Sequence, residues 1–428
     1  MNLLIKSARI IDPKSKDHNK IRDILIIDGV IKQIASRIEE GKKSTKKGIK
    51  KVFTANNLHV SLGWFDMHAN FGEPGHEQAE TLTSGCKAAA QGGFTNVMVM
   101  PNTTPCLDNK GQIEFINNKT KNDIVRVHPA GTITKGKEGN EIVEMHDMNR
   151  AGCLAFTDDK KSVTRSEIMK IALLYAKDSG ALIMNYPNEQ VIANDGHIHE
   201  GNTSTKLGLK GIPSLAEEMM VDRDISLADY TQSKLHLSYL SAAKSVDKVK
   251  AAKKQGLHIT ADVALHNLFL TDKEVNNFDT RYKVLPPLRT AKDNKALIKG
   301  LKNGSIDVIC SDHSPQEEEQ KKVEFDNAAN GIIGLESAFG LIVKHLEEHL
   351  TITQIIEKIA INPRKILDIS TVGIEEGNCA DITLFNPALE WKFTTEDIQS
   401  KSVNTPFVGE QLKGKALAIY NKGQFQEC

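Results

Sequence analysis

Hydrophobic and polar positions follow two different rhythms along the chain. Near the start, apolar residues alternate with polar ones over residues 3–11 and 23–34, and polar turns separate these segments. Such alternation is typical of strands with one buried face. The same pattern returns near the end of the chain, at residues 381–385, 391–393 and 416–420. We therefore predict short strands at both ends of the chain.

The middle of the chain repeats a different unit, a short apolar run followed by an amphipathic stretch. The apolar runs cover residues 95–100, 181–184, 235–240, 258–261 and 306–310. The helix candidates are residues 81–90, 165–178, 212–231 and 242–254. A strand followed by a helix, repeated over about 300 residues, is typical of a (β/α)8 TIM-type barrel, and a doubly wound sheet is the alternative.

These two rhythms predict the division of the 428 residues. We predict a barrel over residues 62–365 and a small β-sandwich domain formed by both termini, residues 1–61 and 366–428. A chain of this length has room for one large domain and one small one.

Composition and charge indicate which partners and which cellular location to expect. Lys+Arg and Asp+Glu both number 55, so the formal net charge is zero, and we expect neither nucleic acid nor an anionic membrane as a partner. The basic run at residues 41–51 is interpreted as a solvated loop rather than an anion-binding patch. The six cysteines form no CxxC pair, and we find no signal peptide and no membrane span. We therefore expect a cytoplasmic protein.

Several motifs occur in a fixed order. The segment at 63–75 contains Asp66 and His68 and ends in Glu73-Pro74-Gly75. It is followed by the segments M-P-N-T-T-P at 100–105, A-F-T-D-D at 155–159, P-P-L-R at 286–289, D-H-S-P at 312–315 and G-N-C-A-D-I-T-L at 377–384. In this order the motifs resemble those of class I dihydroorotases, members of the amidohydrolase superfamily, over nearly the whole chain.

The resemblance implies a metal-dependent cyclic amide hydrolase, because dihydroorotases use zinc-type ions to activate water and the substrate carbonyl. Carried over residue by residue, the ligand positions hold His68, Asn70, Asp158 or Asp159, Tyr186, Tyr239 and Asp312. Asn70, Tyr186 and Tyr239 stand where the family has histidines, and His236 survives beside Tyr239. Asn and Tyr are poor zinc ligands, so no bound metal cofactor is expected.

The substrate pocket also departs from the family pattern. Gly72 replaces the arginine that the resemblance implies for the substrate carboxylate, Leu285 replaces an asparagine and Gln316 replaces a histidine. Asn102 is retained as the candidate substrate-binding residue, and Asp312 is retained as the candidate catalytic base of a degenerate site.

Some of these residues have simpler interpretations. His68 and Asp312 can be structural, and Tyr186 and Tyr239 can fill a vacated cavity rather than perform acid–base chemistry. The pair His197 and His199, followed by Glu200, has metal-like spacing but is interpreted as part of a surface loop.

Three functions stay open. The resemblance favours a non-catalytic dihydroorotase homologue that acts as a structural partner of aspartate transcarbamoylase in pyrimidine biosynthesis, and it implies a homo-oligomer. The alternatives are an active dihydroorotase with an altered site, and a module that binds a small cyclic amide without turnover. Fold alone does not decide among them.

Overall fold

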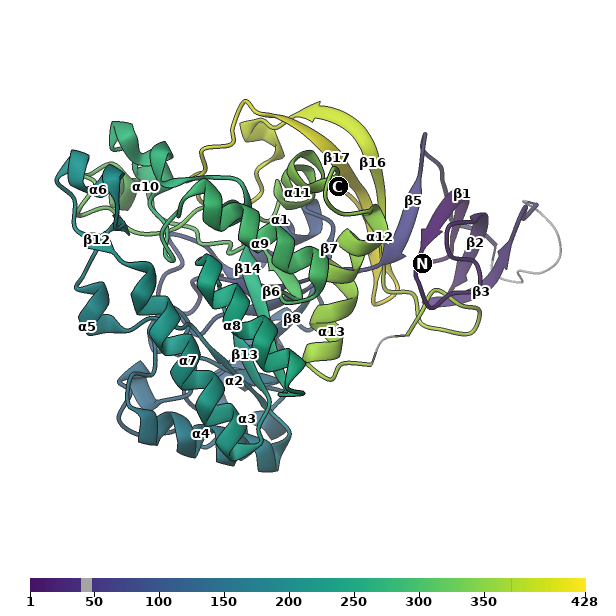
Figure 1. Ribbon diagram of the computed structural model, residues 1–428. Coiled ribbons are helices and arrows are strands. Elements are labelled where there is room, and N and C mark those ends of the chain that lie inside the picture. Colours follow the sequence, from purple (N-terminus) through teal and green to yellow (C-terminus); the bar gives the residue numbers. More distant parts are fainter. Residues whose placement is uncertain (40–47, 371) are drawn as a thin grey trace.

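The computed structural model of the chain describes residues 1–39, 48–370 and 372–428. Most of the basic run at 41–51 lies outside the described residues, so the predicted solvated loop stays a prediction. Figure 1 shows a large barrel with helices around it and, to one side, strands from both ends of the chain.

Eight parallel strands of the described chain form the barrel. One sheet has the order β6-β7-β8, and the other has the order β9-β10-β13-β14-β15. Parallel bridges from Gly131 to Phe156 and from Ala69 to His313 join the two sheets and close the ring. The strands are β6 (Trp64–Ala69), β7 (Phe94–Val99), β8 (Arg126–Pro129), β9 (Ala155–Phe156), β10 (Leu182–Asn185), β13 (Leu235–Leu237), β14 (Ile259–Ala264) and β15 (Val308–Cys310).

The outer helices arise where the amphipathic stretches predict them. The helix predicted at 81–90 is α1 (Leu82–Gln91), and its capping box joins Thr81 and Ser84. The others predicted are α4 (Ser166–Ser179), α7 (Ser214–Thr231) and α8 (Ala243–Lys254). The remaining longer helices are α2 (Lys110–Thr120), α3 (Met145–Arg150), α6 (Asn202–Leu207), α9 (Ala291–Asn303) and α11 (Ala338–Leu346). Shorter ones are α5 (Gln190–Ala193), α10 (Glu318–Lys321), α12 (Ile352–Ile356) and α13 (Asn362–Ile366).

Both ends of the chain enter one eight-stranded sheet, with the order β18-β17-β16-β5-β1-β2-β3 and with β4 paired to β1. Its N-terminal strands are β1 (Leu3–Ile11), β2 (Ile21–Ile27), β3 (Val30–Ala35), β4 (Lys51–Phe53) and β5 (His59–Leu62). Its C-terminal strands are β16 (Ile382–Lys392), β17 (Gln411–Asn421) and β18 (Gln424–Glu427). The antiparallel pairing of β5 with β16 joins the two ends, and β16 and β17 curve over the barrel in Figure 1.

Two details of the sheet differ from the sequence pattern. The segments at 381–385 and 391–393 belong to the single long strand β16, because register shifts in its pairing with β17 let the ladder continue through Pro387. The segment at 23–34 is a hairpin of β2 and β3 that turns at Asp28 and Gly29, both at positive φ. The boundaries at 61/62 and 365/366 stay a prediction.

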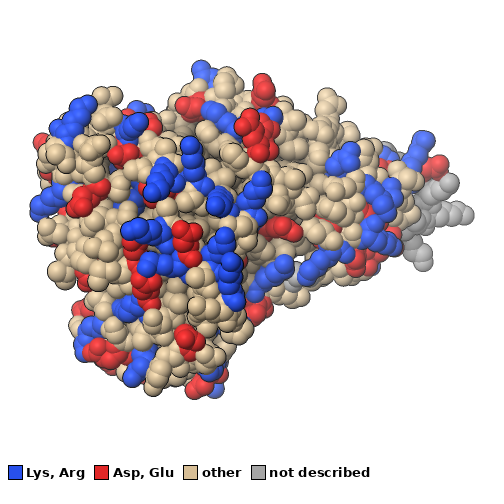
Figure 2. Space-filling view, in the orientation of Figure 1, with Lys and Arg blue, Asp and Glu red and all other residues tan. Residues whose placement is uncertain are grey.

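Two further observations bear on the surface. Lys and Arg are interspersed with Asp and Glu over the face drawn in Figure 2, as expected for a chain of zero net charge. Across the residues that the structure describes, no helix has the length and apolar character needed to cross a membrane.

Candidate functional site

The side chains of interest gather at the mouth of the barrel, where the C-terminal ends of the strands meet. A cavity of about 370 Å³ opens there. It is lined by Asn70, Gly72, His76, Ala79, Glu80, Asn102, Lys137, Asp159, Lys160, Lys161, Ser314, Pro315, Gln316, Glu317, Gln320 and Asn330. The end of a barrel strand is where TIM-barrel proteins place their functional residues.

The two neighbouring aspartates after β9 have different surroundings. Asp158 accepts hydrogen bonds from the backbone N–H groups of Ile133 (2.8 Å) and Thr134 (3.1 Å) and from the Thr134 hydroxyl, so it anchors the loop after β8. Asp159 points into the cavity and accepts hydrogen bonds from Asn102 Nδ2 and from the Tyr239 hydroxyl. Of the two, Asp159 is the one that lines the cavity.

Asp312, the predicted base, follows β15 and is fully buried. The Lys160 ammonium lies 2.7 Å from its Oδ1 and 2.8 Å from its Oδ2. Burial raises the pKa of Asp312 to about 6, although the lysine favours the carboxylate. The His266 Nε2 is 3.7 Å away from Oδ2. Burial and the Lys160 charge lower the pKa of His266 to about 3, so this imidazole is neutral.

Tyr186 and Tyr239 stand at the ends of β10 and β13 and are almost completely buried. The Tyr239 hydroxyl donates to Asp159 Oδ1 over 2.9 Å. The two rings meet edge to face with centroids 6.3 Å apart, and they pack with Ala264, Cys310 and Leu285. Burial and the nearby Asp159 carboxylate raise the pKa of the Tyr239 hydroxyl well above its usual range. The tyrosines thus pack together as buried, neutral groups at the ends of β10 and β13.

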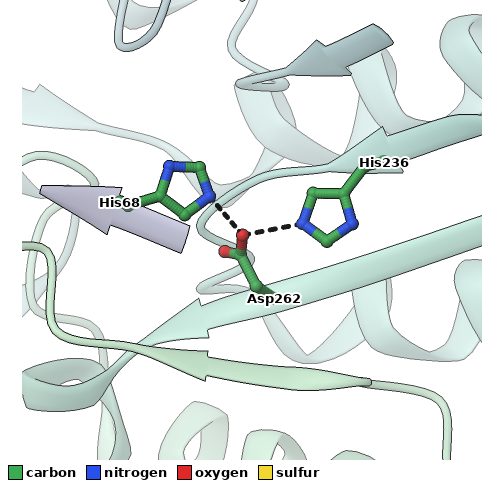
Figure 3. A group of neighbouring side chains, drawn as sticks. All are labelled: His68, His236 and Asp262. Atoms are coloured by element: carbon green, nitrogen blue, oxygen red, sulfur yellow. Dashed lines mark hydrogen bonds and ion pairs between the residues drawn. The ribbon is translucent and has the colours of Figure 1, made fainter. Parts of the chain in front are cut away.

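Two imidazoles converge on one carboxylate (Figure 3), and the His68 ring also lies against the Tyr239 ring, with centroids 4.2 Å apart. His68 Nε2 contacts Asp262 Oδ2, and His236 Nε2 lies 2.7 Å from the same oxygen. These ligand atoms lie within 4.8 Å of one another, so the trio could hold a metal ion. Asp262 Oδ1 accepts the backbone N–H of Tyr239, and His236 Nδ1 lies 2.8 Å from the Thr260 hydroxyl. Hydrogen bonds alone therefore account for the arrangement.

The electrostatics of this trio agree with an ion pair. Burial alone lowers the pKa of His68, but the Asp262 carboxylate outweighs it and raises that pKa above its ordinary value. Burial works against the charged form of Asp262, yet the two imidazoles lower the pKa of this carboxyl far below its usual range. The positive charge on His68 is thus matched by a protein carboxylate.

A chain of amides crosses the open side of the cavity. Asn102 Nδ2 donates to Asn70 Oδ1 over 2.8 Å, and Lys137 Nζ donates to Asn102 Oδ1. Asn70 Nδ2 in turn lies 3.3 Å from both the His313 carbonyl and the Ser314 hydroxyl. Asn102, the predicted substrate-binding residue, is therefore hydrogen-bonded on both sides within the protein.

The other three positions that the resemblance singles out, Gly72, Leu285 and Gln316, have local contacts in the fold. Gly72 has a φ of +62°, and a Cβ placed on it would come within 2.6 Å of the His76 carbonyl and 2.8 Å of the Glu80 carbonyl. Gln316 Nε2 donates to the Asn330 carbonyl over 3.0 Å. Leu285 packs against the two tyrosines.

The pair His197 and His199 is not brought to the mouth. His199 lies in β11 (Ile198–His199), paired with β12 (Gly211–Ile212), and it is buried rather than in an open loop. Its Nδ1 lies 3.1 Å from Nη1 of Arg289, a buried arginine that also contacts Glu217 over 3.6 Å. The histidine therefore takes part in a structural network around the P-P-L-R arginine.

Sequence reasoning missed three charged residues of the site: Lys160, Asp262 and Lys137. Asp262 lies in the apolar strand β14 and belongs to no motif. An acidic residue among apolar neighbours is seldom buried unless it is paired, and this feature of the sequence could have identified it. Lys160 adjoins the A-F-T-D-D motif, but nothing in the local pattern separates it from the exposed Lys161.

Comparisons with known proteins identify the family. A family model described as "Dihydro-orotase-like" matches residues 59–245. A dihydroorotase of Geobacter metallireducens is 41% identical over 418 residues, which are 97% of this chain and 97% of that protein. A dihydroorotase of Pelotomaculum thermopropionicum is 42% identical over 426 residues, 99% of this chain and 98% of the relative.

Among solved structures, an L-hydantoinase from Arthrobacter aurescens superposes with a TM-score of 0.84 and 19% sequence identity. The match covers 99% of this chain and 95% of the hydantoinase. At that identity the likeness concerns the fold alone, and it confirms the predicted TIM-type barrel with a β-domain formed by both termini.

Proposed function

Because the chain belongs to the dihydroorotase family, we propose that it is a member of that family which serves pyrimidine biosynthesis without catalysing the reaction. The observation that supports this proposal is the set of side chains at the barrel mouth. Three family histidine positions hold Asn70, Tyr186 and Tyr239, and the Lys160 ammonium lies 2.7 Å from the carboxylate of Asp312.

The side chains present do not fit the zinc-type ion of the active relatives. A zinc site needs several imidazole, carboxylate or thiolate lone pairs directed at one point. Here the Tyr239 hydroxyl and the Asn102 amide donate hydrogen bonds to Asp159, and a cation lies against Asp312. His68 is directed at Asp262 instead of the cavity. The carboxylates that would bind the metal thus have protein partners.

The resemblance supplies a role for such a protein. We propose that the chain is a structural partner of aspartate transcarbamoylase, that it forms a homo-oligomer and that it resides in the cytoplasm. Size-exclusion chromatography with light scattering, on the chain alone and mixed with aspartate transcarbamoylase of the same organism, tests this. Co-elution at a defined stoichiometry supports the role, and separate elution at micromolar concentrations rejects it.

The second candidate is an active dihydroorotase with an altered site. The names of the relatives favour it, because dihydroorotases match 97% or more of the chain at about 40% identity. This candidate needs a metal held by some other set of side chains, and among the described residues the trio of His68, His236 and Asp262 is a possible set.

The assay that separates the two candidates measures interconversion of dihydroorotate and carbamoyl aspartate, with and without added zinc. Metal content is measured on the same samples after dialysis, and a dihydroorotase such as the Geobacter metallireducens relative is the positive control. We expect no turnover and no retained metal. Turnover of about 1 s⁻¹ or more, in the range of ordinary enzymes, would establish the second candidate.

Calorimetric titration with dihydroorotate tests the binding-module hypothesis on the same samples. Saturable binding without turnover would support a binding module in place of a purely structural partner. Absence of both binding and turnover supports the structural role.

A further inference from the structure

Lys160 is part of the site, although the sequence pattern did not predict it. Its side chain is 16% exposed and that of Asp312 is 1% exposed, so the ion pair between them is nearly shielded from water. We propose that the Lys160 ammonium is a built-in counter-ion that takes the place of the metal cation at the barrel mouth. Restoring the family histidines alone would then not restore a metal site. This inference deepens the proposed non-catalytic function and rests on it.

The geometry of the ammonium is that of a bound cation. It lies almost equally far from both oxygens of Asp312, at 2.7 Å and 2.8 Å. It also lies 5.1 Å from the centroid of the Tyr239 ring, where the ring's negative face attracts a positive charge. Tyr239 therefore contributes twice, because its ring faces the cation and its hydroxyl bonds to Asp159.

Among the described residues, Lys160 is the charged side chain in direct contact with Asp312, and His68 favours the carboxylate only from farther away. His266, 3.7 Å away, is held neutral by burial, and its Nε2 has no hydrogen-bond partner among the residues that the structure covers. The charge of His68 is directed to Asp262. Asp159, which also faces this region, is negative and adds repulsion. Without Lys160, Asp312 would be a buried carboxylate with no ammonium in contact with it, which is strongly unfavourable.

The same arrangement disfavours an incoming metal. A divalent ion bound to Asp159 and Asp312 would lie within a few ångströms of the ammonium, and like charges at that distance repel strongly in a shielded site. The ion would have to displace Lys160 from Asp312 or leave it unpaired. Lys160 thus excludes metal by its charge, independently of which residues occupy the histidine positions.

Metal binding by designed variants tests the inference. The set comprises the triple variant Asn70→His, Tyr186→His, Tyr239→His; the same triple variant with Lys160→Ala; and the triple variant with Lys160→Arg, which keeps the charge. Zinc per chain is measured after dialysis, and zinc affinity is measured by calorimetric titration. Circular dichroism confirms that each variant is folded.

We expect zinc binding at about one ion per chain only in the Lys160→Ala background, with an affinity at least ~10²-fold above that of the other two, given the repulsion removed. Equally tight binding by the triple variant with Lys160 in place would overturn the inference. So would tight binding by the Lys160→Arg version. Wild-type turnover does not enter this readout, so the inference can fail while the proposed function stands.

A mutant cycle provides a second test that does not depend on the triple variant. Lys160→Met and Asp312→Asn are made singly and together, and Lys161→Met, an exposed neighbour at the same cavity, is the matched control. If the two groups are counter-ions, each single change lowers the melting temperature and the double variant loses less than the sum of the single changes. Additive losses, or an equal loss from Lys161→Met, would overturn the inference.

Discussion

At the scale of single residues, two side chains at the proposed ligand positions act as hydrogen-bond donors. Histidine ligands offer lone pairs to a cation, whereas the Tyr239 hydroxyl and the Asn70 amide donate to oxygens of the protein. Asp159 accepts hydrogen bonds from the Tyr239 hydroxyl and the Asn102 amide, and Asp312 is paired with Lys160. The resemblance assigns these residues to ligand positions, but it does not predict the partners that they have in the fold.

The partners were hard to predict for a physical reason. Lys160 and Lys161 are adjacent and chemically identical, yet one is paired with Asp312 and the other is exposed. Their difference depends on the backbone after β9, where Asp159 has a φ of +50° and reverses the direction of the chain. A left-handed residue other than glycine is not visible in a hydrophobic pattern.

Tyr239→Phe tests the donor role of the hydroxyl. The change removes one hydrogen bond from the buried Asp159 while keeping the ring beside Lys160. We expect a loss of about 1–3 kcal/mol in the free energy of unfolding, the cost of leaving a buried acceptor short of a donor. Urea denaturation measures this loss. Tyr230→Phe, at a side chain that is 75% exposed, is the control and should change stability by less than about 0.5 kcal/mol. Equal effects of the two changes would contradict the donor role.

At the scale of elements, two strand ends of the barrel have an unusual backbone conformation. Tyr239 and Asp312, at the ends of β13 and β15, have φ values of +57° and +50°. Such conformations persist where the surrounding structure holds them. The sequence predicted most of the strands and helices that carry these ends, because an element buried on one face has a regular spacing of hydrophobic residues. The backbone conformation of a strand end produces no such spacing, so it was not predicted.

The connection between α1 and β7 is a point where only glycine fits. Gly93 has a φ of +86°, and a Cβ would come within 2.6 Å of the Ala416 Cβ in β17 and 2.7 Å of the Trp64 ring. Gly304, at the end of α9, has a similar φ of +80°, but a Cβ on it would meet no atom within 4 Å. The two glycines thus share the backbone requirement and differ only in packing.

We expect Gly304→Ala to cost about 1–2 kcal/mol for the left-handed backbone alone. Gly93→Ala should cost about 1–3 kcal/mol more, because the methyl group overpacks the junction of barrel and sheet. Guanidinium denaturation of both variants measures the difference. Equal losses would mean that β17 moves aside at no energetic cost.

The segment after α10 depends on a buried lysine. Lys321 Nζ donates to the carbonyls of Ala329 (2.8 Å) and Gly331 (3.2 Å). Burial, together with repulsion from Lys283, lowers the pKa of Lys321 to about 7. Between pH 7 and the ordinary lysine pKa of 10.5, the unfolded chain therefore binds this proton more tightly than the folded chain does.

It follows that stability contributed by this site rises as the pH increases above about 7, by up to about 1.4 kcal/mol per pH unit. We expect wild type to gain stability relative to Lys321→Met between pH 7 and 9 in urea denaturation. Lys322→Met, whose ammonium forms an exposed pair with Glu318, should show no such trend relative to wild type. A difference between wild type and Lys321→Met that does not change with pH would contradict the lowered pKa.

At the scale of the whole molecule, the barrel and the sheet were predictable because each follows from a repeated pattern over many residues. The return of strands at the end of the chain predicted that both termini share one domain, and the pairing of β5 with β16 agrees. The function was less predictable, because it depends on whether a few side chains at the strand ends act together. That question requires their positions, which the fold supplies and the sequence does not.

The whole site also limits what substitution can restore. Zinc binding requires enough ligand side chains and requires that the Lys160 charge be absent. Turnover also requires a clamp for the substrate carboxylate. The resemblance assigns that clamp to the position of Gly72, whose φ of +62° and close contacts with the His76 and Glu80 carbonyls leave no room for a side chain. The loop is therefore built around a glycine, and an arginine placed there requires the backbone to move.

A combined variant carries the changes Asn70→His, Tyr186→His, Tyr239→His, Lys160→Ala and Leu285→Asn. We expect it to bind zinc and yet to hydrolyse dihydroorotate far below about 1 s⁻¹. The reason is that misplacing the substrate by about 1 Å already lowers the rate by about 10²-fold. Adding Gly72→Arg should lower the melting temperature without raising the rate, since the new side chain meets two backbone carbonyls. Steady-state kinetics and thermal denaturation of both variants provide the measurement, and Gly139→Arg, at a glycine of positive φ with open space around it, controls for the general cost of the change. A rise in turnover on adding Gly72→Arg, with the melting temperature preserved, would mean that the loop retains the conformation of an active enzyme and that catalysis was lost through side chains alone.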